Sequence, residues 1–408
     1  MSDAAFDPVS FLEAAVQIPS HESVEEMREF VVETLDRFGV ETEVVEGCVV
    51  AEKSSDVPAD GPHLVLNTHL DTVTPHVPFE RGPARDDERG GDCASVEASE
   101  REVQTVIRGR GACDAKGPLA ALLSGFLAVD PDRGRITLAL TPDEEALSLG
   151  AAALTGRLPD TDDRLDGDLF LVGEPTGLDA CTAAKGRFQA TVELSGTAAH
   201  AAEFAGANAV AAAENALAAI RTFDDGADAH PQLGPPKLTP TVIEGGGATN
   251  QVPADCEITV DRRSVPPEGA AEFRSALATA VRESLAADRD VDVAAALTER
   301  ESPFLEAFAT DPDHELVSAV AAAARAGGDA VGLPSDRGGG VRPFGAATEA
   351  SYFAPAPTVV FGPGDIADES GAVAHAEREY VRVREVEAAA TAVERAVAAL
   401  LGDGRADR

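Results

Sequence analysis

Short polar clusters follow several predicted β-strands, and they constrain the fold more than any other feature of the chain. Residues 63–71, 135–145, 168–175 and 356–364 each begin with an apolar, β-branched run and end in polar residues. Such runs are typical of buried strands in a sheet that helices cover on both faces. Because function in open α/β sheets gathers beyond the carboxyl ends of the strands, we expect the polar side chains to meet at one edge.

The polar clusters are rich in histidine and carboxylate side chains. They read HLDTV, GRGACDAKG, TPDEE, VGEPT and VAHAE, and their candidate ligands are His69, Asp114, Glu145, Glu174 and His375. Imidazoles and carboxylates are the side chains that hold divalent cations. Two histidines with three or four carboxylates are enough for two ions, so the pattern favours a two-metal hydrolase.

Two acidic neighbours of these ligands have separate expected roles. Asp71 lies two residues after His69, and the strand period of two places both side chains on one face, so Asp71 can hold the second ring nitrogen. Adjacent carboxylates in a turn point in different directions. Glu145 can therefore bind a metal while Glu144 moves a proton as general base and acid. The alternative for Asp71 is a purely structural contact, and for Asp114 a role in a glycine-rich turn.

The acidic composition limits the partners of the chain. It contains 72 acidic and 33 basic residues, with a formal net charge of −39, and only four of the basic residues are lysines. Because nucleic acid binding needs clustered lysine and arginine, nucleic acid is excluded as a partner. An acid-rich, lysine-poor composition is typical of a halophilic protein, whose self-repulsion is screened by concentrated cations. The alternative is an acidic protein of a low-salt cell.

The length and the apolar pattern set further expectations. A chain of 408 residues predicts two domains. There is no run of 18 apolar residues and no basic start followed by an apolar stretch, so we expect a cytoplasmic protein without a membrane partner. The five cysteines are odd in number and form no C-x-x-C pair, which indicates neither a disulfide framework nor a thiolate zinc site.

The chain changes character near residue 181. We expect residues 1–180 and 300–408 to form two parts of one catalytic domain. Residues 181–299 alternate strand and helix patterns and carry few candidate ligands, which predicts an inserted α+β domain.

Two segments before residue 110 have local patterns of their own. Residues 23–40 predict an amphipathic helix with a capping box of Ser23 and Glu26 and a stop at Gly39. The charged stretch 78–100 predicts a solvated loop near the site.

The motifs HLDTV, GRGACDAKG, TPDEE, VGEPT and GPG followed by AHAEREYV resemble, in order and spacing, those of the M20 metallopeptidase and amidohydrolase family. The resemblance extends over about residues 8 to 400. It implies an α/β fold: a zinc-peptidase-like catalytic domain with a mixed, mainly parallel sheet between helices, and an inserted two-layer, ferredoxin-like α+β lid domain. It also implies two divalent metal ions, for which zinc suits the donor atoms and cobalt or manganese are alternatives.

The resemblance implies a place for each metal ligand. Asp114 is expected to bridge the two ions, and the peptide bond that follows it is expected to be cis. His69 and Glu174 would complete the shell of one ion, and Glu145 and His375 that of the other.

The resemblance also implies catalytic and substrate-binding residues. Asp71 would orient a metal-bound histidine, and Glu144 would activate water. In the lid, His200 would reach the scissile carbonyl, and Asn250 and Arg263 would contact the substrate carboxylate. A homodimer that forms through the lid domain is a further expectation.

Within the family, motifs such as CDAKG, AAKGRF and ATEASYF resemble the acetylornithine deacetylase branch, with the succinyl-diaminopimelate desuccinylase branch as an alternative. We therefore expect a small N-acyl amino acid substrate, as in arginine biosynthesis, cleaved at its amide bond by a metal-bridging hydroxide. The alternatives are a dipeptidase or carboxypeptidase with a dipeptide substrate, and a catalytically inactive metal-binding homologue. Residues 335–340 and 365–373 depart from the family pattern.

The halophilic character predicts that salt stabilises the fold. Raising KCl from roughly 0.1 M to roughly 3 M shortens the screening length from about 10 Å to below 3 Å, and the melting temperature should rise with it. Thermal unfolding followed by circular dichroism measures this. A melting temperature that is independent of KCl would contradict the prediction.

Overall fold

The chain is described by a computed structural model, which covers residues 5–88, 104–285 and 290–403. It divides into two compact units. The second unit comprises residues 183–309 and 346–351, and the first comprises the remainder of the described chain. The domain break that we expected after residue 299 therefore falls inside the second unit, before its strand β16 (Phe308–Ala309).

The first unit is built on an eight-stranded sheet. Its strands, in spatial order, are β1 (Glu43–Val45), β2 (Cys48–Ser54), β6 (Arg135–Thr141), β3 (His63–His69), β7 (Leu169–Gly173), β18 (Thr358–Phe361), β8 (Ala180–Cys181) and β17 (Val341–Arg342). Strand β3 pairs in parallel with β6 and β7, and β18 pairs in parallel with β7. Strands β1 and β2 are antiparallel to their neighbours. The expected mixed, mainly parallel sheet is confirmed.

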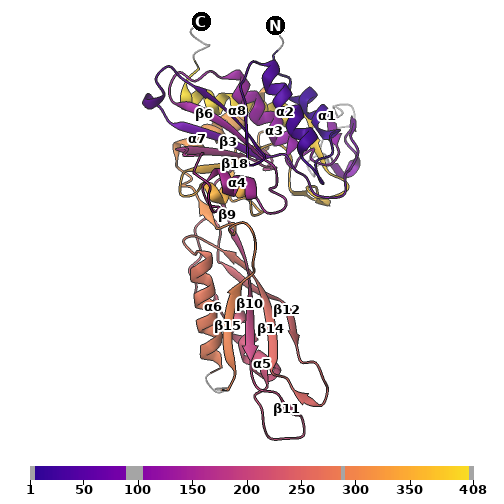
Figure 1. The fold of residues 1–408 in the computed structure, drawn as a ribbon. Coiled ribbons are helices and arrows are strands. Elements are labelled where there is room, and N and C mark those ends of the chain that lie inside the picture. Colours follow the sequence, from indigo (N-terminus) through magenta and orange to yellow (C-terminus); the bar gives the residue numbers. More distant parts are fainter. Residues whose placement is uncertain (1–4, 89–103, 286–289, 404–408) are drawn as a thin grey trace. The chain divides into compact units, whose positions relative to one another are not determined.

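Helices pack around this sheet. They are α1 (Pro8–Val16), α2 (Glu25–Arg37), α3 (Lys116–Ala128), α4 (Leu149–Leu154), α7 (Glu315–Ala330) and α8 (Val383–Leu401). Helix α3 is buried along nearly its whole length and packs against α1 and α8, and α7 packs against α8. In Figure 1 the strands β6, β3 and β18 lie between α8 and α4. One hydrophobic core joins the helices to the sheet.

The charged stretch 78–100 is not a simple loop. Its first part forms β4 (Glu80–Pro83), which pairs with β5 (Thr105–Arg108), and β5 pairs with β21 (Tyr380–Arg382). Glu88 is buried against Arg108. The prediction of a loop is thus wrong for residues 80–83, because pairing with a distant strand determines their conformation, although most side chains of residues 80–88 are exposed as expected. Residues 89–100 lie outside the described residues.

The helix predicted at 23–40 is present, but its capping differs. Helix α2 begins at Glu25, and its N-cap residue Val24 forms no side-chain capping bond. Ser23 Oγ accepts a hydrogen bond from the Glu25 N–H at 3.3 Å, one residue earlier than the predicted capping box requires. Gly39 adopts a φ of +74° just after the helix, as a stop signal should.

The second unit has a two-layer α+β structure. In chain order it contains β10 (Gly186–Ser195), α5 (Ala209–Arg221), β12 (Lys237–Gly245), β14 (Asp255–Ser264), α6 (Ala270–Ser284) and β15 (Asp292–Leu297). The strands lie in the order β12, β14, β10, β15 and all pair antiparallel, which is the ferredoxin-like arrangement. Both helices pack on one face, so alternate residues of β10 are buried.

Short strands complete both units. In the second unit β11 (Ala199–His200) pairs with β13 (Gln251–Val252), and β9 (Ala183–Ala184) pairs with β16. In the first unit β19 (Ala367–Asp368) and β20 (Gly371–Ala372) form a hairpin.

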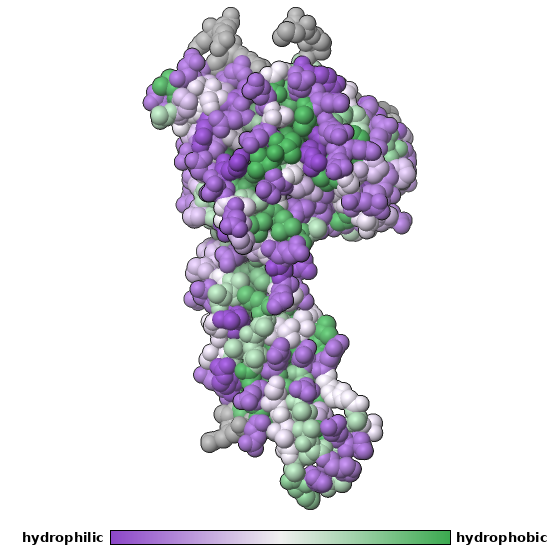
Figure 2. Space-filling model, viewed as in Figure 1, coloured by the Kyte–Doolittle hydropathy of each residue, from purple (hydrophilic) through white to green (hydrophobic). Residues whose placement is uncertain are grey.

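Polar residues dominate the surface of the first unit in the view of Figure 2. The described segments include no helix that is long and apolar enough to cross a membrane.

Candidate metal centre

Three parallel strands deliver candidate ligands to one edge of the sheet. His69 is the last residue of β3, and it is paired with Thr141, the last residue of β6. Glu174 directly follows β7, which is parallel to β3. Glu144 and Glu145 follow β6 in a turn. Parallel pairing therefore places these side chains together, as the sequence pattern predicted.

Candidate ligand atoms from distant segments lie close together. Atoms of His69, Asp114 and Glu145 lie within 4.8 Å of one another, and so do atoms of His69, Glu144 and Glu174. His375 Nε2 lies 3.1 Å from Asp114 Oδ2 and 2.9 Å from Glu145 Oε1. Asp114 therefore contacts both histidines.

Asp71 connects His69 to the turn that follows β6. The Asp71 carboxylate lies 3.2 Å from His69 Nδ1, and the Asp71 carbonyl oxygen lies 3.0 Å from the same nitrogen. Its two carboxylate oxygens accept hydrogen bonds from the N–H groups of Glu144, at 3.1 Å, and Glu145, at 3.0 Å. One side chain thus orients an imidazole and fixes two adjacent glutamates.

The peptide bond between Asp114 and Ala115 is cis, as expected. Gly109 and Gly111, which precede Asp114, both have positive φ angles, so the loop uses conformations that other residues rarely adopt.

The histidines and carboxylates of the cluster shift one another's pKa values. Burial disfavours a charged His69 ring, but Asp114 and Asp71 outweigh burial and raise the pKa of His69 well above its usual value. Hydrogen bonds to Asp114 and Glu145 raise the pKa of His375 to about 10. Burial opposes ionisation of Asp114, yet His375 and His69 hold its pKa well below the usual range. Both shifts favour the protonated imidazoles when no cation is bound, and such protons must leave before the rings can bind metal.

The donor set fits divalent cations. His69 is 1% exposed, and its Nε2 forms no hydrogen bond with any described residue. This nitrogen lies 3.3 Å from Asp114 Oδ1 but lacks the alignment of a hydrogen bond. A buried polar atom without a partner is costly, and a cation shared with the carboxylates would satisfy it.

A buried ion pair next to these ligands was not predicted from the sequence. Arg110 and Glu379 are each 1% exposed and pair at 2.7 Å. Glu379 Oε1 accepts hydrogen bonds from the N–H groups of Cys113 and Asp114, both at 3.2 Å. Arg110 donates to the carbonyl oxygen of His375 at 3.4 Å. The pair therefore joins the Asp114 loop to the His375 segment.

The environment of Glu379 is unusual for a carboxylate. Burial raises the pKa of Glu379 to about 7, and the charge of Asp114 also raises it, whereas Arg110 lowers it. The available sequence signal was the position of both charged residues inside the motifs GRGACD and AHAERE.

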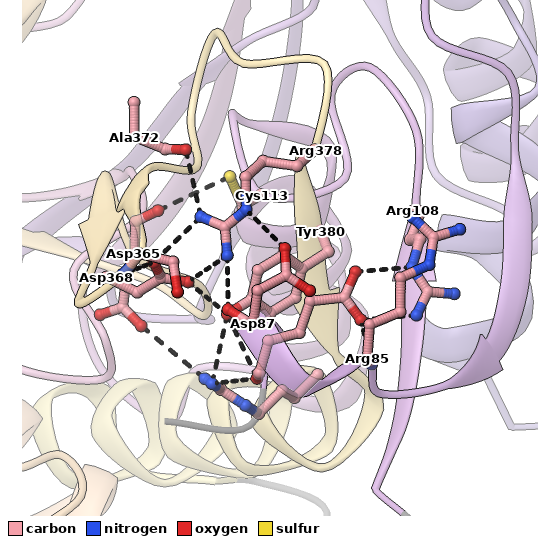
Figure 3. A network of polar contacts seen from close by, with 12 residues as sticks. Arg85, Asp87, Arg108, Cys113, Asp365, Asp368, Ala372, Arg378 and Tyr380 are labelled. Carbon is pink, nitrogen blue, oxygen red and sulfur yellow. Dashed lines mark hydrogen bonds and ion pairs between the residues drawn. The ribbon is translucent and has the colours of Figure 1, made fainter. Parts of the chain in front are cut away.

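Residues 365–373, which depart from the family pattern, contain the β19–β20 hairpin just before His375. Arg378 Nη2 donates to Asp368 Oδ2 at 2.7 Å, and the Tyr380 hydroxyl donates to the same oxygen at 2.8 Å (Figure 3). These contacts attach the hairpin to the segment that follows His375.

The second unusual segment, residues 335–340, contacts the first. Arg337 donates to Asp365 at 2.6 Å and to Glu385 at 2.9 Å. The carbonyl oxygen of Asp365 lies 3.9 Å from Cys113 Sγ, beside the Asp114 loop. The two departures are therefore one connected structure next to the candidate ligands.

His200 and Asn250 lie together in the second unit. His200 is in β11, which pairs with β13, and Asn250 immediately precedes β13. The Ala201 N–H donates to the Asn250 carbonyl oxygen at 2.9 Å. The His200 ring is exposed.

Two adjacent arginines of β14 have different environments. Arg262 is 3% exposed and forms ion pairs with Asp224 and Glu268, so it is a structural residue. Arg263 is 41% exposed and pairs with Asp261 at 2.7 Å. Of the two, Arg263 is the one accessible to a ligand.

Comparisons with known proteins identify relatives of the chain. Residues 65–399 match the model of peptidase family M20/M25/M40. A Pyrobaculum aerophilum protein named as a LysW-lysine/LysW-ornithine hydrolase is 32% identical over 64% of this chain, and the match spans just under two thirds of its own length, 66%. The acetylornithine deacetylase of Myxococcus xanthus is 31% identical over 72% of both chains.

Solved structures share the fold. Aminopeptidase PepT from Bacillus cereus matches with a TM-score of 0.69 and 17% identity, over 96% of this chain and 98% of its own. The Bacillus subtilis YXEP protein, described as a dinuclear metal binding peptidase, matches with a TM-score of 0.62 and 14% identity, over 96% and 97% of the two chains.

The Arg110 and Glu379 pair predicts a specific effect on metal binding. Glu379→Gln should lower affinity for divalent cations by roughly 10- to 100-fold, because the Asp114 loop loses its charged anchor. Competition with a chromophoric chelator measures the affinity. Glu88→Gln is the matched control, since Glu88 is also a buried partner of an arginine, Arg108, and should lower stability without changing metal affinity. Equal metal affinities of the two variants would contradict the prediction.

Proposed function

We propose that this chain, which belongs to peptidase family M20/M25/M40, hydrolyses the amide bond of an N-acyl amino acid at its cluster of histidines and carboxylates. The observation that carries the proposal is the meeting of His69, Asp114, Glu145 and His375, which come from four separate segments. Glu174 adds a further carboxylate beside His69. A chance arrangement of structural residues would not bring this donor set to the end of a parallel sheet.

Two divalent cations are the cofactor that this donor set suits. Asp114 would contribute to the binding of both ions, His69 and Glu174 would hold one, and Glu145 and His375 would hold the other. Nitrogen and oxygen donors favour zinc, with cobalt or manganese as alternatives. Bound here, such ions would lower the pKa of water and polarise a carbonyl oxygen.

Glu144 is the proposed general base and acid. Its N–H is held by Asp71, and its side chain is one of the group that includes His69 and Glu174. Glu144 takes the proton of the attacking water and returns it to the amine that leaves. Asp71 maintains this geometry through its contacts with His69 and with the two glutamates.

The substrate assignment rests on the relatives and on the second unit. One relative is an acetylornithine deacetylase and another is named for hydrolysis of LysW-lysine and LysW-ornithine, so we propose an N-acylated basic amino acid such as N-acetylornithine. His200 is assigned to the substrate carbonyl, and Asn250 and Arg263 to its carboxylate. Exposure of His200 and Arg263 supports these roles.

A hydrolysis panel in molar KCl tests the substrate class. N-acetylornithine and N-acetyllysine should be cleaved faster than succinyl-diaminopimelate or simple dipeptides. Faster cleavage of dipeptides would favour the dipeptidase alternative. The aminopeptidase PepT, which shares this fold, is the reason for including dipeptides in the panel. No hydrolysis of any substrate, with no metal bound, would indicate an inactive homologue.

Glu144→Gln separates proton transfer from metal binding. Turnover of the preferred substrate should fall by roughly 10²- to 10⁴-fold, the usual contribution of a general base. Metal content, measured by plasma mass spectrometry, should stay at about two ions per chain, as in other two-metal sites. The control is Glu387→Gln, which removes an exposed carboxylate of α8. If Glu144→Gln retains turnover within about tenfold of the unchanged protein, the assignment of the base is wrong.

A further inference from the structure

Four polar side-chain atoms without partners lie in two contacting segments, residues 20–21 and 72–76, and the second segment directly follows Asp71. They are Ser20 Oγ, His21 Nδ1, Thr72 Oγ1 and His76 Nδ1, all buried and without a hydrogen bond to any described residue. The rings of His21 and His76 stack with centroids 6.0 Å apart and planes inclined by 15°. The Thr72 N–H donates to the Ser20 carbonyl oxygen at 3.3 Å, so the two segments are in contact. Buried polar atoms in folded proteins nearly always have a hydrogen-bond partner, so these four atoms need an explanation.

Two buried cations hold these segments in place. Lys116 Nζ donates to the carbonyl oxygens of Ala15, at 3.1 Å, and Ile18, at 2.6 Å, just before Ser20. Arg110 donates through its side chain to the Pro75 carbonyl oxygen at 3.0 Å, and through its backbone to Val77 at 3.0 Å.

The backbone on both sides of His76 is thus fixed, while the side-chain donors remain unpaired. Binding groups that are already held in position lose little conformational freedom when a ligand arrives.

The local charge favours an anion. Burial lowers the pKa of His76, and Lys116, His21 and Arg110 lower it further, so the charged groups that act on this ring are cationic. A carboxylate would be attracted, and its oxygens can accept hydrogen bonds from hydroxyl groups and imidazole nitrogens.

The position of the cluster connects it to the candidate active site. Thr72 directly follows Asp71, and Arg110 and Lys116 flank the Asp114 loop. A Cβ atom on Gly111 would lie 3.0 Å from Thr72 Cγ2 and 2.8 Å from Lys116 Cδ, so the two segments pack closely.

We propose that Ser20, His21, Thr72 and His76 form a subsite for a carboxylate of the substrate. The inference rests on the proposed function, since it concerns the substrate of the same site. If the acyl group carries the carboxylate, an N-succinyl substrate is preferred over an N-acetyl one. If the amino acid carries it, this subsite replaces Asn250 and Arg263 as the contact of the α-carboxylate.

Paired substrates test the subsite in the metal-loaded protein. N-succinyl and N-acetyl forms of one amino acid differ in an acyl carboxylate, and an N-acetyl amino acid and its amide differ in the α-carboxylate. In the Ser20→Ala and His76→Phe variants, the preference for the anionic member of one pair should fall by about tenfold, the effect of one hydrogen bond to a charged group. His76→Phe retains the stacked ring. Ser55→Ala is the matched control, because Ser55 Oγ is also buried and unpaired but lies outside the cluster.

Each result is decisive. Loss of preference in the succinyl pair assigns the site to the acyl group, and loss in the α-carboxylate pair assigns it to the amino acid. Unchanged preferences in both pairs, with active variants, would overturn the subsite and indicate that ordered water alone satisfies these atoms.

A binding measurement tests the subsite without depending on catalysis. Calorimetric titration of succinate into the unchanged protein should show binding that Ser20→Ala weakens by about tenfold and Ser55→Ala leaves unchanged. Equal binding to both variants would also overturn the subsite. Absence of hydrolysis by the unchanged protein would instead reject the proposed function, so the two failures are distinguishable.

Discussion

The contacts of the Asp71 carboxylate are the interaction on which the candidate site depends. Parallel pairing brings the end of β3 near the end of β6, but pairing alone does not determine the conformation of the turn that follows. Asp71 does so by accepting hydrogen bonds from the N–H groups of Glu144 and Glu145 while it lies beside His69. A residue that binds no metal in the proposal therefore orients two proposed ligands, His69 and Glu145, and the proposed base, Glu144.

On the other side of the cluster, too, residues that bind no metal in the proposal hold the candidate ligands in position. The Arg110 and Glu379 pair holds the Asp114 loop and the His375 backbone, and both side chains are nearly inaccessible. Burying such a pair has a large desolvation cost, and replacing it with apolar residues often leaves a protein equally stable. Its role here is best explained by positioning, because the ligands that it joins are far apart in the sequence.

The sequence was informative where local pattern determines structure. Apolar runs identified β3, β6, β7 and β18, and the polar residues at the ends of the first three identified His69, Glu145 and Glu174, because strand ends of a parallel sheet share an edge. Asp114 and His375 were identified from their own motifs. The pattern was uninformative where burial depends on distant segments. Glu88 and Glu379 look like solvent-exposed charges in the sequence, and only the folded chain pairs them with Arg108 and Arg110.

The wrong prediction of the helix cap at Ser23 and the failure to predict strand β4 have related causes. Ser23 matched a capping box by spacing alone, but the helix begins one residue later than that spacing requires. Strand β4 was missed because its apolar content is low and its existence depends on β5, more than twenty residues away. The roles of His200, Asn250 and Arg263 came from resemblance, and their own sequence context carries little information beyond it.

The second unit interrupts the set of candidate ligands, since Glu174 precedes it and His375 follows it. During synthesis the ribosome must therefore produce the whole insertion before the last imidazole emerges. Domains generally fold as units in the order in which they are made. Because β18 and α8 of the first unit are also made after the insertion, the sheet cannot be completed, and Asp114 cannot meet His375, until the whole second unit has been synthesised.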